Sequence, residues 1–108
     1  MALSHAEIEQ ACFMLIACSG AAKSDYLEAL ELVKKGEYEQ ADAMIESGDH
    51  NYREAHEAHF GLIQEEVATE GGLLTRLTLV HAEDQLALAE NTKMLVTQLI
   101  ELYKLVRK

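Results

Sequence analysis

The chain of 108 residues contains no proline and no tryptophan, and it has only six glycines and two cysteines. Since proline breaks helix interiors and sheet ladders, its absence allows long uninterrupted elements anywhere in the chain. Cys12 and Cys18 are six residues apart and would lie on different faces of one helix, so we expect no disulfide between them. They are too few and too widely spaced for a zinc site. We therefore expect free thiols of a reducing compartment.

Basic residues are also scarce: nine stand against nineteen acidic ones, for a formal net charge of −10. Such a charge argues against a nucleic-acid surface and against docking on an anionic membrane. No apolar run approaches the ~18 residues of a membrane span. The longest run, residues 11–18, follows Glu7 and Glu9 instead of a basic segment, so it does not read as a signal peptide. The sequence predicts one cytoplasmic domain over residues 1–108, small enough for self-association to add to its core.

No stretch alternates strictly between apolar and polar residues, so no strands are expected. Ser4, with Glu7 three residues later, has the pattern of a helix-capping box. Apolar residues at helical spacing then form three segments, which end at Gly36, at Gly71–Gly72 and at the C-terminus, the third beginning near Leu74. In the middle of the second segment, Gly48 and Asp49 are able to bend or weaken the helix. The predicted fold is all-α, an antiparallel three-helix bundle with long helices.

The third helix carries more apolar surface than one seam of a bundle requires. One stripe contains His81 and Asp84 among apolar or near-apolar positions 74, 77, 88, 95, 102 and 105. An adjacent flank carries Leu79, Leu86, Val96, Ile100 and Tyr103. A helix that is apolar on two sides faces two neighbours, so we expect assembly through this helix, with a homotrimer as the closed form. Because a packed seam seldom holds a polar pair without a reason, His81 and Asp84 are the first candidates for function.

Asp84, Asn91 and Gln98 are seven residues apart and stack along one line of the same helix. If that line approaches a symmetry axis, its polar layers would fix the register and the oligomer number. Three Asp84 carboxylates near an axis would repel one another unless they were protonated or bridged by a cation. Oxygen ligands of this kind suit magnesium or a similar hard ion. The alternative is an outward polar face, and the pattern alone leaves both open.

The five histidines differ in their surroundings. His5 and His50 lie near a terminus and near a break in the helical pattern, where solvent exposure is expected. His56 and His59 share a helix face that could hold a metal, but no histidine completes the Glu-x-x-His motif of di-iron bundles, so structural or partner-facing roles are favoured. His81 lies in the stripe of the third helix, and imidazole is a nitrogen nucleophile near neutral pH. Since the chain has no Gly-rich phosphate loop, a phosphoryl group for His81 must come from another protein.

Several short motifs resemble one known family. Residues 79–86, Leu-Val-His-Ala-Glu-Asp-Gln-Leu, resemble that family's Leu-Val-His-Ala-Gln-Asp-His-Leu, and residues 19–24 resemble its Ala-Gly-Asn-Ala-Arg-Ser. Further matches lie at residues 28–30, 35–41, 54–56, 62–64 and 100–104. On these motifs the chain resembles the lactose/cellobiose-type IIA component of the bacterial phosphoenolpyruvate-dependent sugar phosphotransferase system, from about Glu9 to Lys104.

The resemblance implies a homotrimer of three-helix bundles that acts as a phosphotransferase in sugar transport. His81 would accept a phosphoryl group from the histidine-containing phosphocarrier protein and pass it to a cysteine of the sugar-specific IIB component. Asp84 would correspond to the family's carboxylate that holds one magnesium ion per trimer at the trimer centre. A IIA component does not touch the sugar, so the resemblance does not name the sugar that is transported.

Four residues depart from the family pattern. Glu83 replaces a glutamine, Gln85 a histidine, Ala21 an asparagine and Ala87 a methionine. Gln85 is four residues from His81 on the same helix face, so it remains able to donate a hydrogen bond to a phosphoryl oxygen. The spacing of Glu83 turns its charge away from that face.

Two other functions are weighed beside the phosphocarrier. A non-catalytic regulatory paralogue would keep the trimer and bind partners without transfer, and the four departures leave that function open. A histidine phosphotransfer module of two-component signalling is also helical with one reactive histidine. Such modules usually follow the histidine with leucine, then lysine and glycine, whereas here residues 82–85 are Ala-Glu-Asp-Gln. The two-component module therefore ranks below the phosphocarrier.

Overall fold

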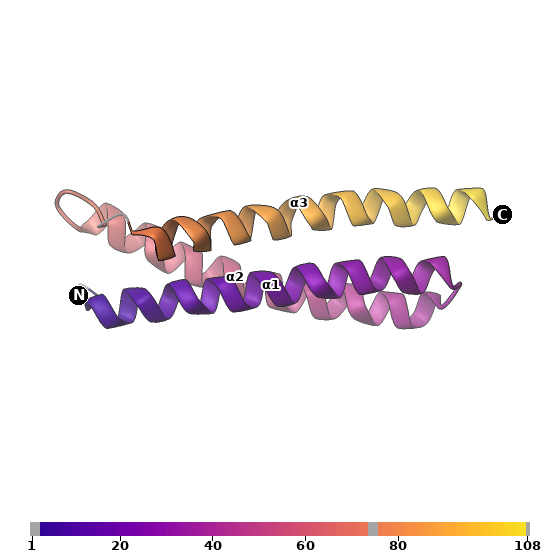
Figure 1. Ribbon diagram of the computed structural model, residues 1–108, viewed down its shortest axis with the longest axis horizontal. Helices are drawn as coiled ribbons and strands as arrows, with labels where there is room; N and C mark the ends of the chain where they lie inside the picture. The colour runs from indigo at the N-terminus through magenta and orange to yellow at the C-terminus, as the bar shows by residue number, and fades with distance from the viewer. Residues whose placement is uncertain (1–2, 74–75, 108) are drawn as a thin grey trace.

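The structure, a computed structural model, describes residues 3–73 and 76–107. Within these residues the chain forms three long helices and no strand: α1 spans His5–Lys34, α2 spans Tyr38–Ala68 and α3 spans Leu77–Val106. α1 and α3 run in one direction along the long axis of the molecule and α2 runs back, so the two chain ends lie at opposite ends (Figure 1). The prediction of an all-α fold with three long helices is confirmed.

The first helix begins where the sequence predicts. Ser4 Oγ accepts a hydrogen bond from the backbone N–H of Glu7 at 3.1 Å, and the Glu7 carboxylate accepts one from the N–H of Ser4 at 2.9 Å. Both halves of the capping box are therefore present. These bonds hold the pKa of the Glu7 carboxyl below its ordinary value. α1 ends at Lys34, and Gly36 follows with a φ of 79°, a left-handed conformation that glycine adopts without steric cost.

The third helix begins later than the sequence predicts. Arg76 is its N-cap residue and has extended backbone angles, with φ −123° and ψ 160°, so α3 starts at Leu77. An extended residue cannot lie inside a helix, and the predicted start near Leu74 is therefore wrong; Leu74 itself lies outside the described residues. The Arg76 side chain makes no capping hydrogen bond, so this boundary carries no local sequence signal.

The side of α1 that faces both other helices forms the centre of the molecule. Buried residues recur on it every three or four positions, at Cys12, Leu15, Ser19, Ala22, Tyr26, Ala29 and Val33. α3 packs along α1 through Ala82, Leu86, Ala89 and Val96, and it touches α2 much less. The alanines permit a close approach of the two helices. α3 is consequently covered mainly on one side.

α2 is continuous through its middle, so Gly48 and Asp49 do not interrupt the helix. Gly48 instead receives the ring of Tyr26 from α1, because a Cβ at Gly48 would lie only 2.7 Å from Cε1 of that ring. Tyr26 is fully buried, and its hydroxyl donates a hydrogen bond to Asp49 Oδ1 at 2.7 Å. The missing side chain at Gly48 therefore makes room for a side chain of the neighbouring helix.

Asp49 joins all three helices. Besides accepting the Tyr26 hydroxyl of α1, its Oδ1 lies 2.9 Å from Nζ of Lys93 on α3. Burial alone would raise the pKa of Asp49, but the Tyr26 hydrogen bond and the Lys93 ammonium outweigh it, so the pKa lies below its ordinary value. Burial, together with the Asp49 carboxylate, raises the pKa of the Tyr26 phenol far above its usual range. Tyr26 thus stays a protonated donor at every physiological pH.

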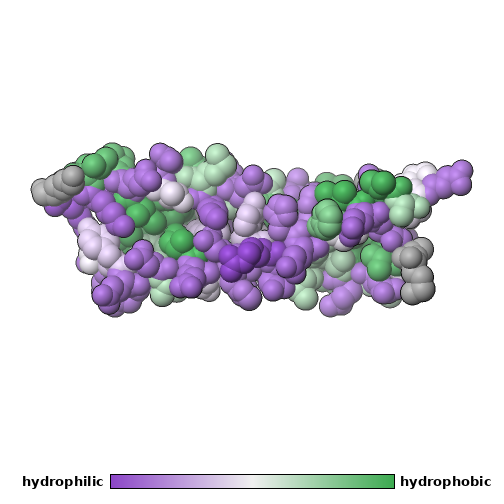
Figure 2. All heavy atoms as spheres, turned by 180° about the vertical axis from the view of Figure 1, so that it is seen from behind, coloured by the Kyte–Doolittle hydropathy of each residue, from purple (hydrophilic) through white to green (hydrophobic). Residues whose placement is uncertain are grey.

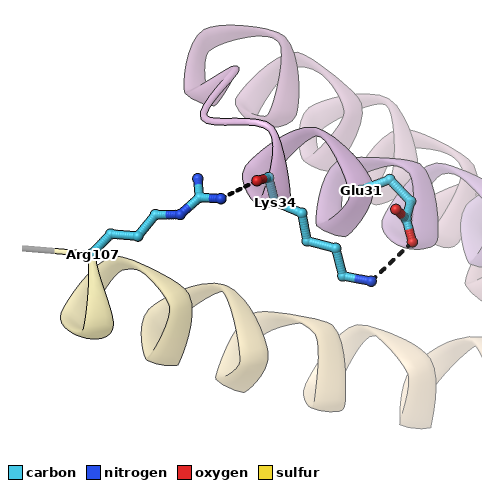
Figure 3. Close-up of polar contacts among 3 residues, drawn as sticks. All are labelled: Glu31, Lys34 and Arg107. Carbon is cyan, nitrogen blue, oxygen red and sulfur yellow. Dashed lines mark hydrogen bonds and ion pairs between the residues drawn. The ribbon is translucent and has the colours of Figure 1, made fainter.

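The C-terminal ends of α1 and α3 are tied together by one arginine (Figure 3). Arg107 donates from Nη1 to the carbonyl of Val33 at 2.7 Å and from Nη2 to the carbonyl of Lys34. Positive charge is favoured at this end of a helix, where the carbonyl groups point outward. On the same turn, Lys34 Nζ pairs with the Glu31 carboxylate at 3.1 Å.

Candidate functional site

His81 lies in the second turn of α3, and its side chain is exposed. It borders a shallow groove of about 360 Å³ between α1 and α3. The other lining residues are Phe13 and Ile16 of α1 and Leu77 and Thr78 of α3, so the groove is mostly apolar. An imidazole at the rim of an open groove can be reached by another protein, while the apolar walls shield one side of it from water.

The stripe of α3 that contains His81 and Asp84 is not packed within the chain, although the apolar spacing predicted a packed seam. Its described apolar members are exposed, Leu77 at 84% and Leu95 at 57%, together with Leu88, Leu102 and Leu105. The residues that face α1 lie on almost the opposite side of α3, since each residue turns a helix by about 100°. The spacing identified both apolar sides but not which one packs inside the chain.

Exposed large apolar side chains are not confined to α3. Phe13 and Met14 of α1, and Phe60, Ile63 and Val67 of α2, are also exposed. On the face of the molecule seen in Figure 2, apolar side chains gather toward the two ends, with hydrophilic ones between them. None of the helices in the described part of the chain is long and apolar enough to cross a membrane. Exposed apolar surface of this extent is a common sign of contact with other proteins.

The two other predicted site residues lie near His81 on the same helix. Asp84 is exposed in the stripe, and Asn91 and Gln98 follow it along the exposed side of α3. Gln85 is half-buried, one turn after His81 on the flank toward α1. Among the described residues, no three His, Cys, Asp or Glu side chains of one chain come together as a metal site. Asp84 offers the carboxylate oxygen that a hard cation prefers.

Glu83 reaches across to α2, away from the face of His81, as its spacing predicts. Its Oε2 lies 2.7 Å and its Oε1 3.0 Å from Nε2 of His59, whose side chain is 19% exposed. His59 therefore has a structural role, and His56 stands beside it with ring centroids 6.3 Å apart. His5 and His50 are exposed, as expected.

The two cysteines are poor alternatives to His81 as nucleophiles. Cys12 and Cys18 are both free, and burial raises the pKa of each thiol. Nearby carboxylates, Glu83 for Cys12 among them, raise these pKa values further. A thiol with a raised pKa carries less thiolate at neutral pH, and the thiolate is the reactive form. Of these three side chains, only the exposed imidazole combines access with nucleophilic character.

Phe13 and Ile16 are residues of the site that the sequence reasoning missed. A signal was present, because Cys12 and Leu15 already occupy the buried face of α1. Phe13 and Ile16 each follow one of these residues, about 100° further round the helix, so apolar side chains extend beyond the buried face of α1. That they lie next to His81 depends on how α1 and α3 pack together, which the pattern of one helix does not contain.

Known proteins resemble the chain along nearly its whole length. The sequence model of the family described as PTS system, Lactose/Cellobiose specific IIA subunit, matches residues 10–104. The PTS system oligo-beta-mannoside-specific EIIA component of Bacillus subtilis (strain 168) is 36% identical over 104 residues, which cover 96% of this chain and 94% of that protein. The PTS system lactose-specific EIIA component of Staphylococcus aureus (strain N315) is 33% identical over 102 residues, covering 94% of this chain and 98% of that protein.

Solved structures share the fold as well. The crystal structure of the PTS cellobiose specific enzyme IIA from Bacillus anthracis has a TM-score of 0.87 at 34% identity, covering 97% of this chain and 94% of that one. A chain from the solution structures of the IIA(Chitobiose)–HPr complex of the N,N'-diacetylchitobiose branch of the Escherichia coli phosphotransferase system has a TM-score of 0.82 at 34% identity, covering 94% of this chain and 98% of that one. Sequence and structure agree that this chain belongs to the lactose/cellobiose-specific IIA family of the phosphotransferase system.

Proposed function

We propose that this protein is a cytoplasmic phosphocarrier of sugar uptake in which His81 is the phosphoryl acceptor. The observation that carries the proposal is the exposed imidazole of His81 at the rim of an open groove, in a chain of the IIA family. The donor is HPr, the histidine-containing phosphocarrier protein, because a related IIA chain occurs in a complex with HPr. The acceptor of the second transfer is a cysteine of a sugar-specific IIB component.

Two displacements at phosphorus make up the proposed reaction. In the first, the lone pair of a ring nitrogen of neutral His81 attacks the phosphorus of the donor's phosphohistidine. The new N–P bond forms as the donor's N–P bond breaks, and the donor imidazole leaves with that electron pair. In the second, the thiolate of the IIB cysteine attacks the same phosphorus and the His81 imidazole leaves. The chain itself supplies position, and Gln85 donates a hydrogen bond to a phosphoryl oxygen.

We also propose that residues 1–108 form one antiparallel three-helix bundle that assembles as a homotrimer through α3. The exposed leucines of α3 support this, since Leu88, Leu95 and Leu102 recur every seven residues, the repeat of helices that pack together in a coiled coil. Asp84 would then lie near the threefold axis. One Asp84 carboxylate from each chain would hold a magnesium ion, whose charge offsets the repulsion among the three carboxylates.

The two alternative functions, a two-component phosphotransfer module and a regulatory paralogue, differ from the phosphocarrier in what they predict. The family match over residues 10–104 leaves the two-component phosphotransfer module without support. A regulatory paralogue would keep the fold and the trimer but would not be phosphorylated. Phosphoryl labelling of the purified chain therefore separates the carrier from the paralogue.

The labelling experiment uses phosphoenolpyruvate and the two general proteins of the phosphotransferase system, followed by intact-protein mass spectrometry. We expect a mass gain of one acid-labile phosphate in the wild type and none in His81→Ala. His50→Ala removes another exposed histidine and is the matched control, which should be labelled like the wild type. An unlabelled wild type would favour the regulatory paralogue, and a labelled His81→Ala would move the acceptor to another residue.

The assembly is tested separately by sedimentation and by magnesium titration. Asp84→Leu should abolish magnesium binding and leave the trimer intact or more stable, because it removes the carboxylate repulsion. Glu101→Leu changes an exposed acid on another flank of α3 and should alter neither property. Dissociation of Asp84→Leu into monomers would count against the axial placement of this residue.

A further inference from the structure

The start of α3, which carries His81, has little local support. α1 begins with a complete capping box, whereas Arg76 at the N-cap of α3 makes no side-chain hydrogen bond and no acidic residue lies in the first turn. Without these, the first N–H groups and the helix dipole have no compensating partner from the helix's own side chains. Since His81 lies in the second turn, its position depends on the tertiary contacts made beside it.

Two such contacts are made by the residues directly after His81, and they act on different sides of α3. Ala82 is fully buried in the core cluster that contains Cys12 and Leu15 of α1. A methyl group permits close approach of the helices, but its few contacts resist rotation of α3 about its axis only weakly. On the side toward α2, Glu83 lies 2.7 Å from Nε2 of His59. An ionised carboxylate has no hydrogen to donate, so the ring N–H is the donor whether His59 is neutral or protonated.

We infer that the His59–Glu83 pair is a positioning device for His81, an inference that rests on the proposed role of His81 as phosphoryl acceptor. Ala82 sets the distance between α3 and α1. The pair, together with Leu79 and Leu86 packed toward α1, sets the rotation of α3. Together they fix the direction in which His81 presents its ring over the groove. Because α3 otherwise touches α2 little, few other contacts to α2 remain to replace this one when it is lost.

The expected loss of transfer rate follows from the geometry that phosphoryl transfer requires. The attacking nitrogen, the phosphorus and the leaving nitrogen must lie in line, and a misplacement of about 1 Å can cost about 10²-fold in rate. Loss of this one contact should displace His81 by less than that, so we expect a decrease of about tenfold. The decrease should appear in the transfer step within the docked complex, and not in docking itself.

The experiment measures single-turnover transfer from phosphorylated HPr to the full-length chain at increasing HPr concentration. Glu83→Ala should lower the rate at saturating HPr about tenfold and leave the half-saturating HPr concentration unchanged. Glu83→Gln should stay within about twofold of the wild type, because its amide oxygen still accepts from the ring N–H. His59→Ala removes the same contact from the other helix, and the double variant should be no slower than either single one.

Lys93→Met is the matched control. The Lys93–Asp49 pair also joins α3 to α2, at 2.9 Å, but it lies twelve residues or about 18 Å along α3 from His81. Its loss should lower thermal stability and leave the transfer rate unchanged. Amide hydrogen exchange provides a readout that does not depend on activity: Glu83→Ala should speed exchange at the start of α3, and Lys93→Met should not.

Equal slowing by Glu83→Ala and Lys93→Met would overturn the inference, and so would a wild-type rate with unchanged exchange in Glu83→Ala. If Glu83→Ala does not fold, His59→Ala carries the same comparison. An unlabelled wild type would refute the proposed function instead, and hydrogen exchange would then decide alone whether the pair orders the start of α3.

Discussion

Replacement of Gly48 by alanine disturbs the contact that brings α1 and α2 together near their middle. The added Cβ would lie 2.7 Å from Cε1 and 2.9 Å from Cδ1 of Tyr26. Carbon atoms attract one another best at about 3.5–4.0 Å, so the ring or the helices must move by roughly 1 Å. The ring cannot simply swing aside, because Tyr26 is fully buried and its hydroxyl is bonded to Asp49, the next residue of α2.

Two effects of opposite sign set the magnitude. Overpacking of this kind typically costs about 1–3 kcal/mol. Alanine in place of glycine inside a helix stabilises by about 0.5–1 kcal/mol, so Gly48→Ala should destabilise by up to about 2.5 kcal/mol in total. Gly61 is the matched control, since it also lies inside α2 but has no atom within 4 Å of the position that a Cβ would take. Gly61→Ala should stabilise by about 0.5–1 kcal/mol.

Urea unfolding followed by far-UV circular dichroism measures both variants, at one protein concentration so that self-association stays constant. The two free energies of unfolding should differ by about 1–3 kcal/mol, the cost of the overpacking alone, because both variants gain the same helix stabilisation from alanine. In a Tyr26→Leu background Gly48→Ala should cost less, because the ring that it meets is gone. If Gly48→Ala is as stable as Gly61→Ala, the Tyr26 ring does not occupy the space above Gly48 and the reasoning is refuted.

Three further substitutions test separate contacts. Ser19→Ala should stabilise by up to about 1 kcal/mol, because the Ser19 hydroxyl is buried without a hydrogen-bond partner among the described residues; a loss of stability in urea would show that it has one. Arg107→Leu should lower the free energy of unfolding by about 1 kcal/mol through its bonds to the end of α1, and an unchanged value would mean that they contribute nothing. Since the folded-state pKa of Asp49 is lowered, the stability that Asp49 contributes is fully present above about pH 4 and is lost as the pH falls through that lower pKa. Asp49→Asn should therefore lose less stability than the wild type between about pH 5 and pH 3, and equal losses would contradict this role.

The helices and both boundaries of α1 follow directly from the sequence, because the interactions that form them are local. Ser4 and Glu7 bond to each other across a single turn, and Gly36 adopts the conformation that other residues avoid. The start of α3 lacked any such local bond at Arg76, and there the predicted boundary was wrong. Local signals predict local structure only where they are present.

The sequence predicted which residue types the candidate site contains, but not which side of α3 is exposed at the surface. The motif around His81 predicts the nucleophile, and the acceptor role of His81 stays a prediction. The apolar spacing of α3 described two sides of similar character, and it assigned His81 to a packed seam that is exposed in the chain. Which side meets α1 is decided by Ala82 and Ala89, whose small side chains permit the close approach of the helices.

The sequence by itself determined the three helices, the capped start of α1 and the chemical character of the site, because each depends on residues a turn or two apart. Tertiary structure alone decided that Gly48 makes room for Tyr26 and that Glu83 pairs with His59. These partners come from different helices, and periodicity within one helix does not encode how two helices are placed against each other. Contacts between helices depend on how their surfaces fit, and the folded molecule alone reveals that fit.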